Sequence, residues 1–270
     1  LIPLSPSRDR ESSSENIQFL AATVNTEYKF HTSMTAQSAC YHGLPLHVLG
    51  AGIKNIYEKG LGEKIHLLHN FIQNIDEGAD RSTVIMFVDG TDVLIQASPQ
   101  EILRRFLATG ERVLFSGEHS CYPMKFFPWN LNLNARNDRT DKWAACTAGS
   151  CSNSRYICDH LFLRKPQNVY DTHNRWLNSG AFIGYASDLR LILNDAMSVP
   201  RHMLAKWPGF DQGLYTHMYL SRRYGIDIDV DSRVFASYGF VGNPAETGGV
   251  VGLKGTEGYI QESNYIPNSN

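Results

Sequence analysis

Residues 84–88 are five consecutive apolar residues that run directly into two closely spaced carboxylates, Asp89 and Asp92. The run is apolar throughout and lacks the alternation of a half-exposed strand, so it predicts a strand that is covered on both faces. Strands of this kind are typical of parallel sheets that lie between layers of helices. We therefore expect an α/β fold with this strand inside the sheet.

Strand and helix patterns alternate on both sides of this strand. Ser98-Pro99-Gln100-Glu101 forms a capping box with proline at the first helical position, and Gly110 marks the expected end of that helix. Residues 113–115 are again apolar, so strand, helix and strand predict a right-handed crossover unit. Further strands are expected at residues 19–24 and 46–50, and further helices at 33–41, from 61 to a stop at Gly78, around 189–197 and at 210–224.

The length and charge of the chain bound its organisation. Its 270 residues, 42% apolar and 19% charged, suffice for one large domain, which we place at residues 16–270. Residues 1–15 are rich in serine and are expected to form a flexible lead-in, whereas residues 121–169 lack periodicity, which predicts a lid or insertion. With 25 Lys and Arg against 27 Asp and Glu we expect no nucleic-acid partner, and the short apolar runs predict neither a membrane segment nor a signal peptide.

Five cysteines leave the cellular compartment open, because an odd count cannot be fully paired within one chain. They are Cys40, Cys121, Cys146, Cys151 and Cys158. The last three lie within 13 residues of a Ser/Asn/Gly-rich stretch, so a local disulfide is the favoured interpretation. Free thiols and a zinc site that includes His160 are the alternatives, although the spacing differs from that of zinc modules.

The pair Asp89 and Asp92 stands where the chain leaves the buried strand. In open α/β sheets ligands collect at the carboxyl ends of strands, so both carboxylates are expected to face one small space. Hard oxygen ligands suit Mn²⁺ or Mg²⁺ that holds a diphosphate. Asp89-Gly90 is also a hairpin signal, but the uniformly apolar strand and the helix after it favour the metal site.

Four sequence blocks occur in an order and spacing that point to one family. They are FVDGTDVL at 87–94, VLFSGEHSCYP at 113–123, LNSGAFIGY at 177–185 and DQGLYT at 211–216. Over residues 19–240 the chain resembles the glycosyltransferase domain of the multifunctional procollagen lysyl hydroxylases. The resemblance implies a GT-A-like fold, a Rossmann-like mixed sheet flanked by helices.

The same resemblance implies an activity. It is the Mn²⁺-dependent transfer of glucose or galactose from UDP-glucose or UDP-galactose to an acceptor hydroxyl, with retention of configuration. The implied acceptor is a collagen-like hydroxylysine glycoside or another glycan or glycoprotein. The implied location is the lumen of the secretory pathway, in the endoplasmic reticulum or Golgi.

Individual roles follow from the position of each residue within the resemblance. Asp89 and Asp92 correspond to the metal-binding pair. Asp89 is also implied in binding the nucleotide and donor sugar, together with Thr23, Tyr57, Lys64, Ser179, Gly180 and Gln212. The residues implied in catalysis are Glu118, Asn178 and Asp211. Structural roles are the alternatives: Thr23 as an ordinary strand end, Glu118 as a solvated one, and Asp211 as a helix N-cap.

The chain departs from the family in two places. The family carries a run of aspartates where this chain has only Asp211. The family's third metal ligand is a histidine in a His-Gly-Asn-Gly-like block, which this sequence lacks up to Asn270, so we expect either a chain cut before the block or a site completed otherwise. The other candidates also have structural alternatives. His173, His202 and His217 are candidates for the metal, but surface or helix histidines are commoner. Trp129, Trp143 and Trp176 are candidates for the acceptor sugar, but buried core aromatics are commoner.

Two other function classes stay open. One is a catalytically silent glycosyltransferase-like module that binds a UDP-sugar or a carbohydrate, which the missing histidine block favours. The other is a metal-dependent sugar-nucleotide pyrophosphorylase or phosphatase, which would use the same acids on a similar sheet. Release of free hexose or phosphate without an acceptor would distinguish the second class.

Overall fold

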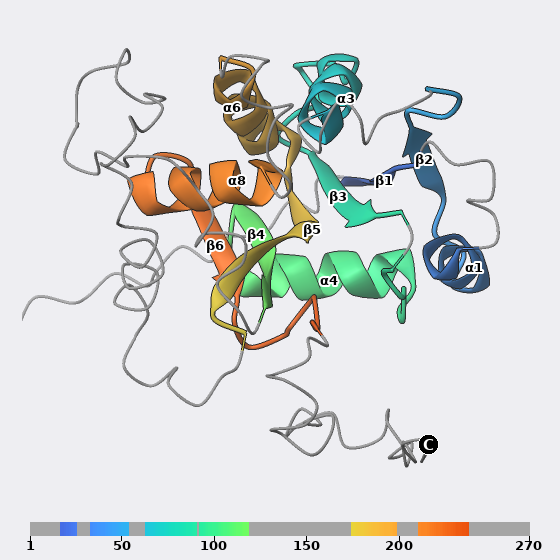
Figure 1. Ribbon diagram of the computed structural model, residues 1–270. Helices are drawn as coiled ribbons and strands as arrows, with labels where there is room; N and C mark the ends of the chain where they lie inside the picture. Colours follow the sequence, from blue (N-terminus) through green and yellow to red (C-terminus); the bar gives the residue numbers. More distant parts are fainter. Residues whose placement is uncertain are drawn as a thin grey trace, which may run out of the picture.

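A mixed six-stranded sheet organises the part of the chain that the structure describes (Figure 1). The computed structural model describes residues 17–25, 33–53, 63–90, 92–118, 174–198 and 210–237. The strand order is β2-β1-β3-β5-β4-β6. The strands are β1 Gln18–Val24, β2 Leu46–Leu49, β3 Thr83–Asp89, β4 Val113–Glu118, β5 Trp176–Tyr185 and β6 Ile226–Asp229. The predicted α/β class with a mixed sheet is confirmed.

One strand runs against the others. β5 is antiparallel to both of its neighbours, β3 and β4, whereas β1 with β2, β1 with β3, and β4 with β6 are parallel pairs. The amino end of β5 therefore lies beside the carboxyl ends of β3 and β4. The strand, helix and strand predicted around residues 84–115 are present, but β5 is inserted between the two strands of that unit.

Helices cover both faces of the sheet. They are α1 Met34–Tyr41, α3 Glu63–Gln73, α4 Pro99–Thr109, α6 Ala186–Ala196 and α8 Phe210–Ser221. In Figure 1, α3, α6 and α8 lie on one side and α4 on the other. Each side has its own apolar cluster: Phe87 belongs to the one beneath α3, α6 and α8, and Met86 to the one that also holds Ile102 and Phe106 of α4. Because both faces are covered, every residue from Thr83 to Val88 is buried, as the uniform pattern predicts.

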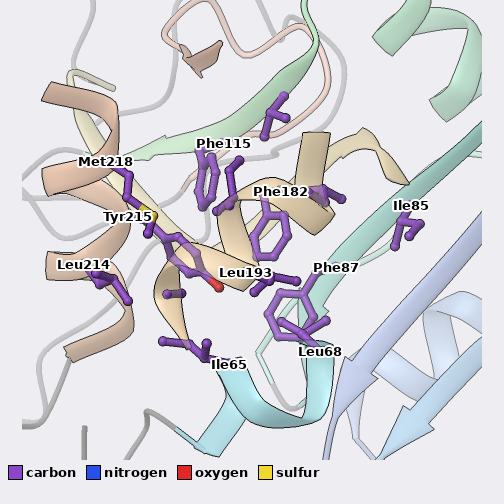
Figure 2. Packing of buried hydrophobic residues seen from close by; sticks show 14 of the residues in the cluster. Ile65, Leu68, Ile85, Phe87, Phe115, Phe182, Leu193, Leu214, Tyr215 and Met218 are labelled. Carbon is purple, nitrogen blue, oxygen red and sulfur yellow. The ribbon is translucent and has the colours of Figure 1, made fainter. Parts of the chain in front are cut away.

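Aromatic rings attach α8 to the middle of the sheet. Phe87, Phe182 and Phe115 come from three adjacent strands, and their rings stack with centroids 5.1 and 4.7 Å apart. Tyr215 of α8 packs 5.0 Å from Phe115 (Figure 2). Such pairs stabilise a core beyond their buried area. The first turn of α8 is therefore held close to the strand ends that carry the candidate site.

The helix predictions hold with two corrections. Ser98 caps α4 by accepting a hydrogen bond from the Glu101 amide at 3.3 Å, and Gly110 ends it with φ 74°, but the Glu101 carboxylate pairs with Arg104 and Arg105. α3 ends at Gln73, well before Gly78, because the chain tightens into short turns that an Asp76 side chain supports.

Other predictions fall partly outside the described residues. Residues 1–15 and 121–169 lie outside them, so the lead-in, the lid and the single-domain organisation stay predictions. Cys40 is unpaired and exposed, and the other four cysteines lie outside the described ranges. Among the described helices, none is both long and apolar enough to cross a bilayer.

Candidate active site

The sheet topology gathers the predicted site residues at one edge. Asp89 ends β3 and Glu118 ends β4, while Thr23 of β1 lies beside Val88. Because β5 is antiparallel, Asn178 lies opposite Ser116 at the same edge. Ligands of open α/β sheets bind at the carboxyl ends of strands, which is where these residues lie.

A break in strand pairing shapes the middle of this edge. The partner of Phe115 on β5 is Phe182, but the partner of Ser116 is Asn178, so residues 179–181 form a bulge relative to β4. Pairing between β3 and β5 begins only at Ala181. The amides of Ser179 and Gly180 therefore have no strand partner in these ladders and turn to side chains instead. Bulges of this kind are common beside active sites.

A lysine lies between two of the aspartates. Lys64 Nζ donates to Asp89 Oδ1 at 2.6 Å and lies 3.8 Å from Asp211 Oδ2. Burial raises the pKa of Asp89 to about 6; the Lys64 charge opposes this, and the charges of Asp211 and Asp92 add to it. Among the described residues, three carboxylates lie near one ammonium group, and a bound cation would relieve this excess of negative charge.

The turn that carries the second carboxylate is held by α1. Thr35 Oγ1 donates to the Asp89 carbonyl at 3.1 Å and accepts from the Val93 amide at 3.2 Å. A Cβ added to Gly90 would lie only 2.8 Å from the Val24 carbonyl oxygen, so the turn packs tightly on β1. The hairpin interpretation of Asp89-Gly90 is wrong, because β3 pairs with β1 and β5 and the chain continues to α4.

The carboxylates fit a hydrated, diphosphate-bound metal better than a closed protein cage. Asp89 offers a desolvated carboxylate at the edge, and Asp92 is exposed and close enough for its charge to act on Asp89. Within the described ranges, no group of three or more His, Cys, Asp or Glu side chains is arranged to hold a metal ion. Mg²⁺ and similar ions accept one or two carboxylates when phosphate and water complete the shell. His217 of α8 joins no such group, and His173 and His202 lie outside the described residues.

Two amides hold the carboxyl group of Glu118. Gln212 Nε2 lies 2.5 Å from its Oε1, and Asn178 Nδ2 lies 3.1 Å from its Oε2. Burial raises the pKa of Glu118 to about 7, although both amides oppose the shift by stabilising the charged form. Near neutral pH this carboxyl group can therefore accept or release a proton, which fits a residue that handles sugar hydroxyls.

Asn178 and Gly180 connect Glu118 to Asp89. Asn178 Oδ1 accepts hydrogen bonds from the Gly180 amide at 2.7 Å and from Ser116 Oγ at 3.3 Å. A Cβ on Gly180 would lie 2.9 Å from Asn178 Oδ1 and 3.2 Å from Asp89 Oδ2. The backbone at Gly180 thus lies close to a carboxylate of the candidate metal site.

The remaining predicted residues differ in how the structure places them. Ser179 and Asp211 are buried and hydrogen-bonded to each other at 3.0 Å, and Asp211 lies in the first turn of α8. Thr23 is fully buried, and its hydroxyl has no partner among the described residues. Trp176 is half-buried beside Glu118. Tyr57, Trp129 and Trp143 lie outside the described residues.

Two hydroxyl residues that support the loop after β3 were not predictable from the sequence. Thr35 lies 54 residues from the carbonyl that it contacts, and Ser38, which accepts from the Ile95 amide at 2.9 Å, lies 57 residues away. A lone threonine or serine in a short helix has no local signal for such a role. Only the packing of α1 against the loop after β3 brings these hydroxyls to it.

Comparison with known proteins agrees with this geometry. Residues 15–129, which include Lys64, Asp89, Asp92 and Glu118, match the family described as the PLOD GT domain. This match and the curated relatives support a PLOD-type glycosyltransferase domain in this chain. The resemblance to the glycosyltransferase domain of the procollagen lysyl hydroxylases is thereby confirmed.

Relatives of this PLOD-type domain are larger proteins. The human multifunctional procollagen lysine hydroxylase and glycosyltransferase LH3 is 29% identical over 181 residues, which cover 65% of this chain and 18% of LH3. A Drosophila melanogaster procollagen-lysine,2-oxoglutarate 5-dioxygenase is 25% identical over 274 residues, or 98% of this chain and 31% of the relative. A Caenorhabditis elegans multifunctional procollagen lysine hydroxylase and glycosyltransferase is 26% identical over 87% of this chain and 28% of the relative. The chain thus spans less than a third of each relative's length.

Proposed function

We propose that this protein transfers glucose or galactose from a UDP-sugar to a hydroxyl group of a collagen-like glycoside or another glycan or glycoprotein, using Mn²⁺ or Mg²⁺. The observation that carries the proposal is the cluster of Asp89, Lys64 and Asp211 at the ligand edge of a PLOD-type domain. This arrangement offers anionic groups for a metal and a cation for a diphosphate at one place. The secretory-pathway lumen is the proposed location, by analogy with the collagen-modifying relatives.

The aspartates and the lysine would handle the nucleotide. Asp89 and Asp92 would hold the metal ion, which when bound supplies neutralisation of the departing diphosphate. Lys64 sits on Asp89 at 2.6 Å and has a flexible stem, so a small movement of its ammonium group would bring it to a phosphate. The helix that begins one residue before Lys64, at Glu63, adds a partial positive charge near its amino end.

Glu118 and its amide partners would handle the sugars. The Glu118 carboxyl, held by Gln212 and Asn178, has a pKa raised by burial to about 7. It can orient a sugar hydroxyl as an acceptor or take a proton from the attacking hydroxyl. The two amides restrict its rotation, so it meets the substrate in one orientation.

A silent module that binds a UDP-sugar is the second candidate. It is favoured by the small number of metal ligands in the described part of the chain, where no group of three or more His, Cys, Asp or Glu side chains is arranged to hold a metal ion. Such a module would bind UDP through the same residues and would release no UDP from UDP-glucose or UDP-galactose.

UDP release distinguishes these functions. We would measure it with UDP-glucose and with UDP-galactose, with and without Mn²⁺ and a glycosylated collagen-like peptide. The Asp89→Asn, Asp92→Asn double variant is expected to lose metal-dependent release, whereas Asp231→Asn, at an exposed surface ion pair, serves as the control. UDP binding without turnover would favour the silent module, and no binding of any UDP-sugar by the folded chain would refute both.

A further inference from the structure

The amide and the hydroxyl of Ser179 both donate hydrogen bonds to side chains of α8. Its amide donates to Gln212 Oε1 at 3.2 Å, and its hydroxyl donates to Asp211 Oδ2 at 3.0 Å. Its exposure is 6%, so it offers little surface to a ligand. Its amide and its hydroxyl are therefore both engaged within the protein.

The position of Ser179 on β5 explains both why it faces the helix and why its amide is available. Leu177, two residues earlier, belongs to the apolar cluster beneath α3, α6 and α8, and alternate residues of a strand face the same side. Because Ser179 has no partner in the β3 and β4 ladders, its amide is available to a side chain. Gln212 accepts from it, which satisfies a buried backbone group that would otherwise be costly.

The two residues that Ser179 contacts point to different parts of the site. Asp211 is 3% exposed and approaches Lys64, which in turn binds Asp89. Gln212 is 7% exposed, and the nitrogen of its side-chain amide donates to Glu118. Burial of a polar group such as the Asp211 carboxylate is costly without hydrogen-bond donors, and Ser179 supplies one. Ser179 therefore contacts both the residue next to Lys64, in the candidate nucleotide site, and the residue that holds Glu118, in the candidate sugar site.

We propose that Ser179 is a positioning residue for the transfer reaction: it holds the first turn of α8 so that Asp211 faces Lys64 and Gln212 faces Glu118. This inference rests on the proposed function. Ser179 itself touches neither donor nor acceptor. The hydroxyl orients Asp211, which we call the Asp211 arm, and the backbone amide orients Gln212. A substitution of the side chain therefore removes the Asp211 arm and keeps the amide contact with Gln212.

The Ser179→Ala variant tests the Asp211 arm. Loss of a hydrogen bond to a charged group in a buried site is expected to lower kcat by about 10- to 100-fold. UDP affinity, measured by calorimetry, is expected to stay within about threefold, since Lys64 and Asp89 remain paired. The matched control is Ser221→Ala, at the other end of α8, where the hydroxyl donates only to the Met218 carbonyl at 2.7 Å. This control is expected to keep kcat.

A double-mutant cycle separates positioning from general destabilisation. If Ser179 acts through Asp211, then Ser179→Ala in an Asp211→Asn background is expected to change kcat by less than about twofold. Ser179→Thr keeps the hydroxyl and is expected to keep most of kcat. Should the alanine variant fail to fold, Ser179→Cys takes its place, because it fills a similar space with a weak donor.

Each outcome decides between named alternatives. An unchanged kcat in folded Ser179→Ala overturns the inference. A raised KM for the UDP-sugar with kcat retained also overturns it, because that is the signature of a donor contact. Independent effects of the two substitutions in the double-mutant cycle overturn it as well. A loss of kcat shared equally by the alanine and threonine variants also overturns it. Absence of turnover by the unaltered chain refutes the proposed function itself, and with it the role of Ser179.

Discussion

Gly180→Ala is expected to damage the site directly, whereas the matched change Gly184→Ala on the same strand is not. An alanine Cβ at 180 would lie 2.9 Å from Asn178 Oδ1 and 3.2 Å from Asp89 Oδ2. A Cβ at 184 would lie 2.9 Å from Val113 Cγ2 and 3.1 Å from the Arg112 carbonyl oxygen, at the opposite end of β5. The two variants therefore introduce similar steric strain, one within the candidate active site and one at the opposite end of the strand.

The expected magnitudes follow from these distances. Ordinary contacts of a Cβ are about 3.4 Å or more, so Asn178 Oδ1 must move by roughly half an ångström and gives up its short bond to the Gly180 amide. Overpacking of this kind costs about 1–3 kcal/mol of stability in either variant. Displacements of about 1 Å in an active site cost about 100-fold in rate, so we expect Gly180→Ala to lower kcat by at least about tenfold.

Two measurements on each variant test this prediction. Urea unfolding gives the free energy of unfolding, and UDP release with saturating donor gives kcat for the folded protein. Both variants are expected to lose stability, and only Gly180→Ala is expected to lose kcat. Equal kcat values for the two variants would show that the contact of Gly180 with Asn178 and Asp89 has no part in the reaction.

Three further changes test separate parts of the structure. Burial raises the pKa of Glu118 from 4.5 to about 7, so its contribution to stability is present below pH 4.5 and lost as pH rises through 7. Urea unfolding is expected to show a lower free energy of unfolding at pH 8 than at pH 5, and Glu118 is expected to contribute up to about 3 kcal/mol of that difference. Glu118→Gln is expected to remove this contribution. Arg190→Met leaves the Asp80 carboxylate buried without its partner at 2.7 Å, so the free energy of unfolding is expected to fall by about 3–5 kcal/mol. The control Arg233→Met removes an exposed ion pair and is expected to show no such fall. Lys64→Met removes the ammonium group from Asp89, and calorimetry is expected to show UDP binding weakened by about tenfold, a result that unchanged binding would contradict.

Much of the fold was predictable from local patterns. The apolar run at 84–88 identified a strand covered on both faces, because period and composition depend only on neighbouring residues. The capping serine and the terminal glycine of α4 were predictable for the same reason, since both act within one turn of the helix. The end of α3 was not, because the turns after Gln73 depend on side chains that compete with the helix.

The sequence by itself determined the residue types at the site and their place at strand ends. Asp89 and Asp92 follow a buried strand, and Asp211 and Gln212 open a helix, and these facts follow from short-range patterns. They do not say which of these groups meet, because hydrogen bonds between strands and helices join residues far apart in the chain.

Only the tertiary structure decided how the site is joined. β5 enters between β3 and β4 and runs against them, which places Ser179 against α8 and Gly180 against Asp89, and its bulge leaves both amides outside the ladders. A one-residue change in that register would reverse which side chains face the helix, and nothing local in the block LNSG fixes the register. The physical reason is that pairing across the sheet, rather than backbone preference, selects the face on which each side chain lies.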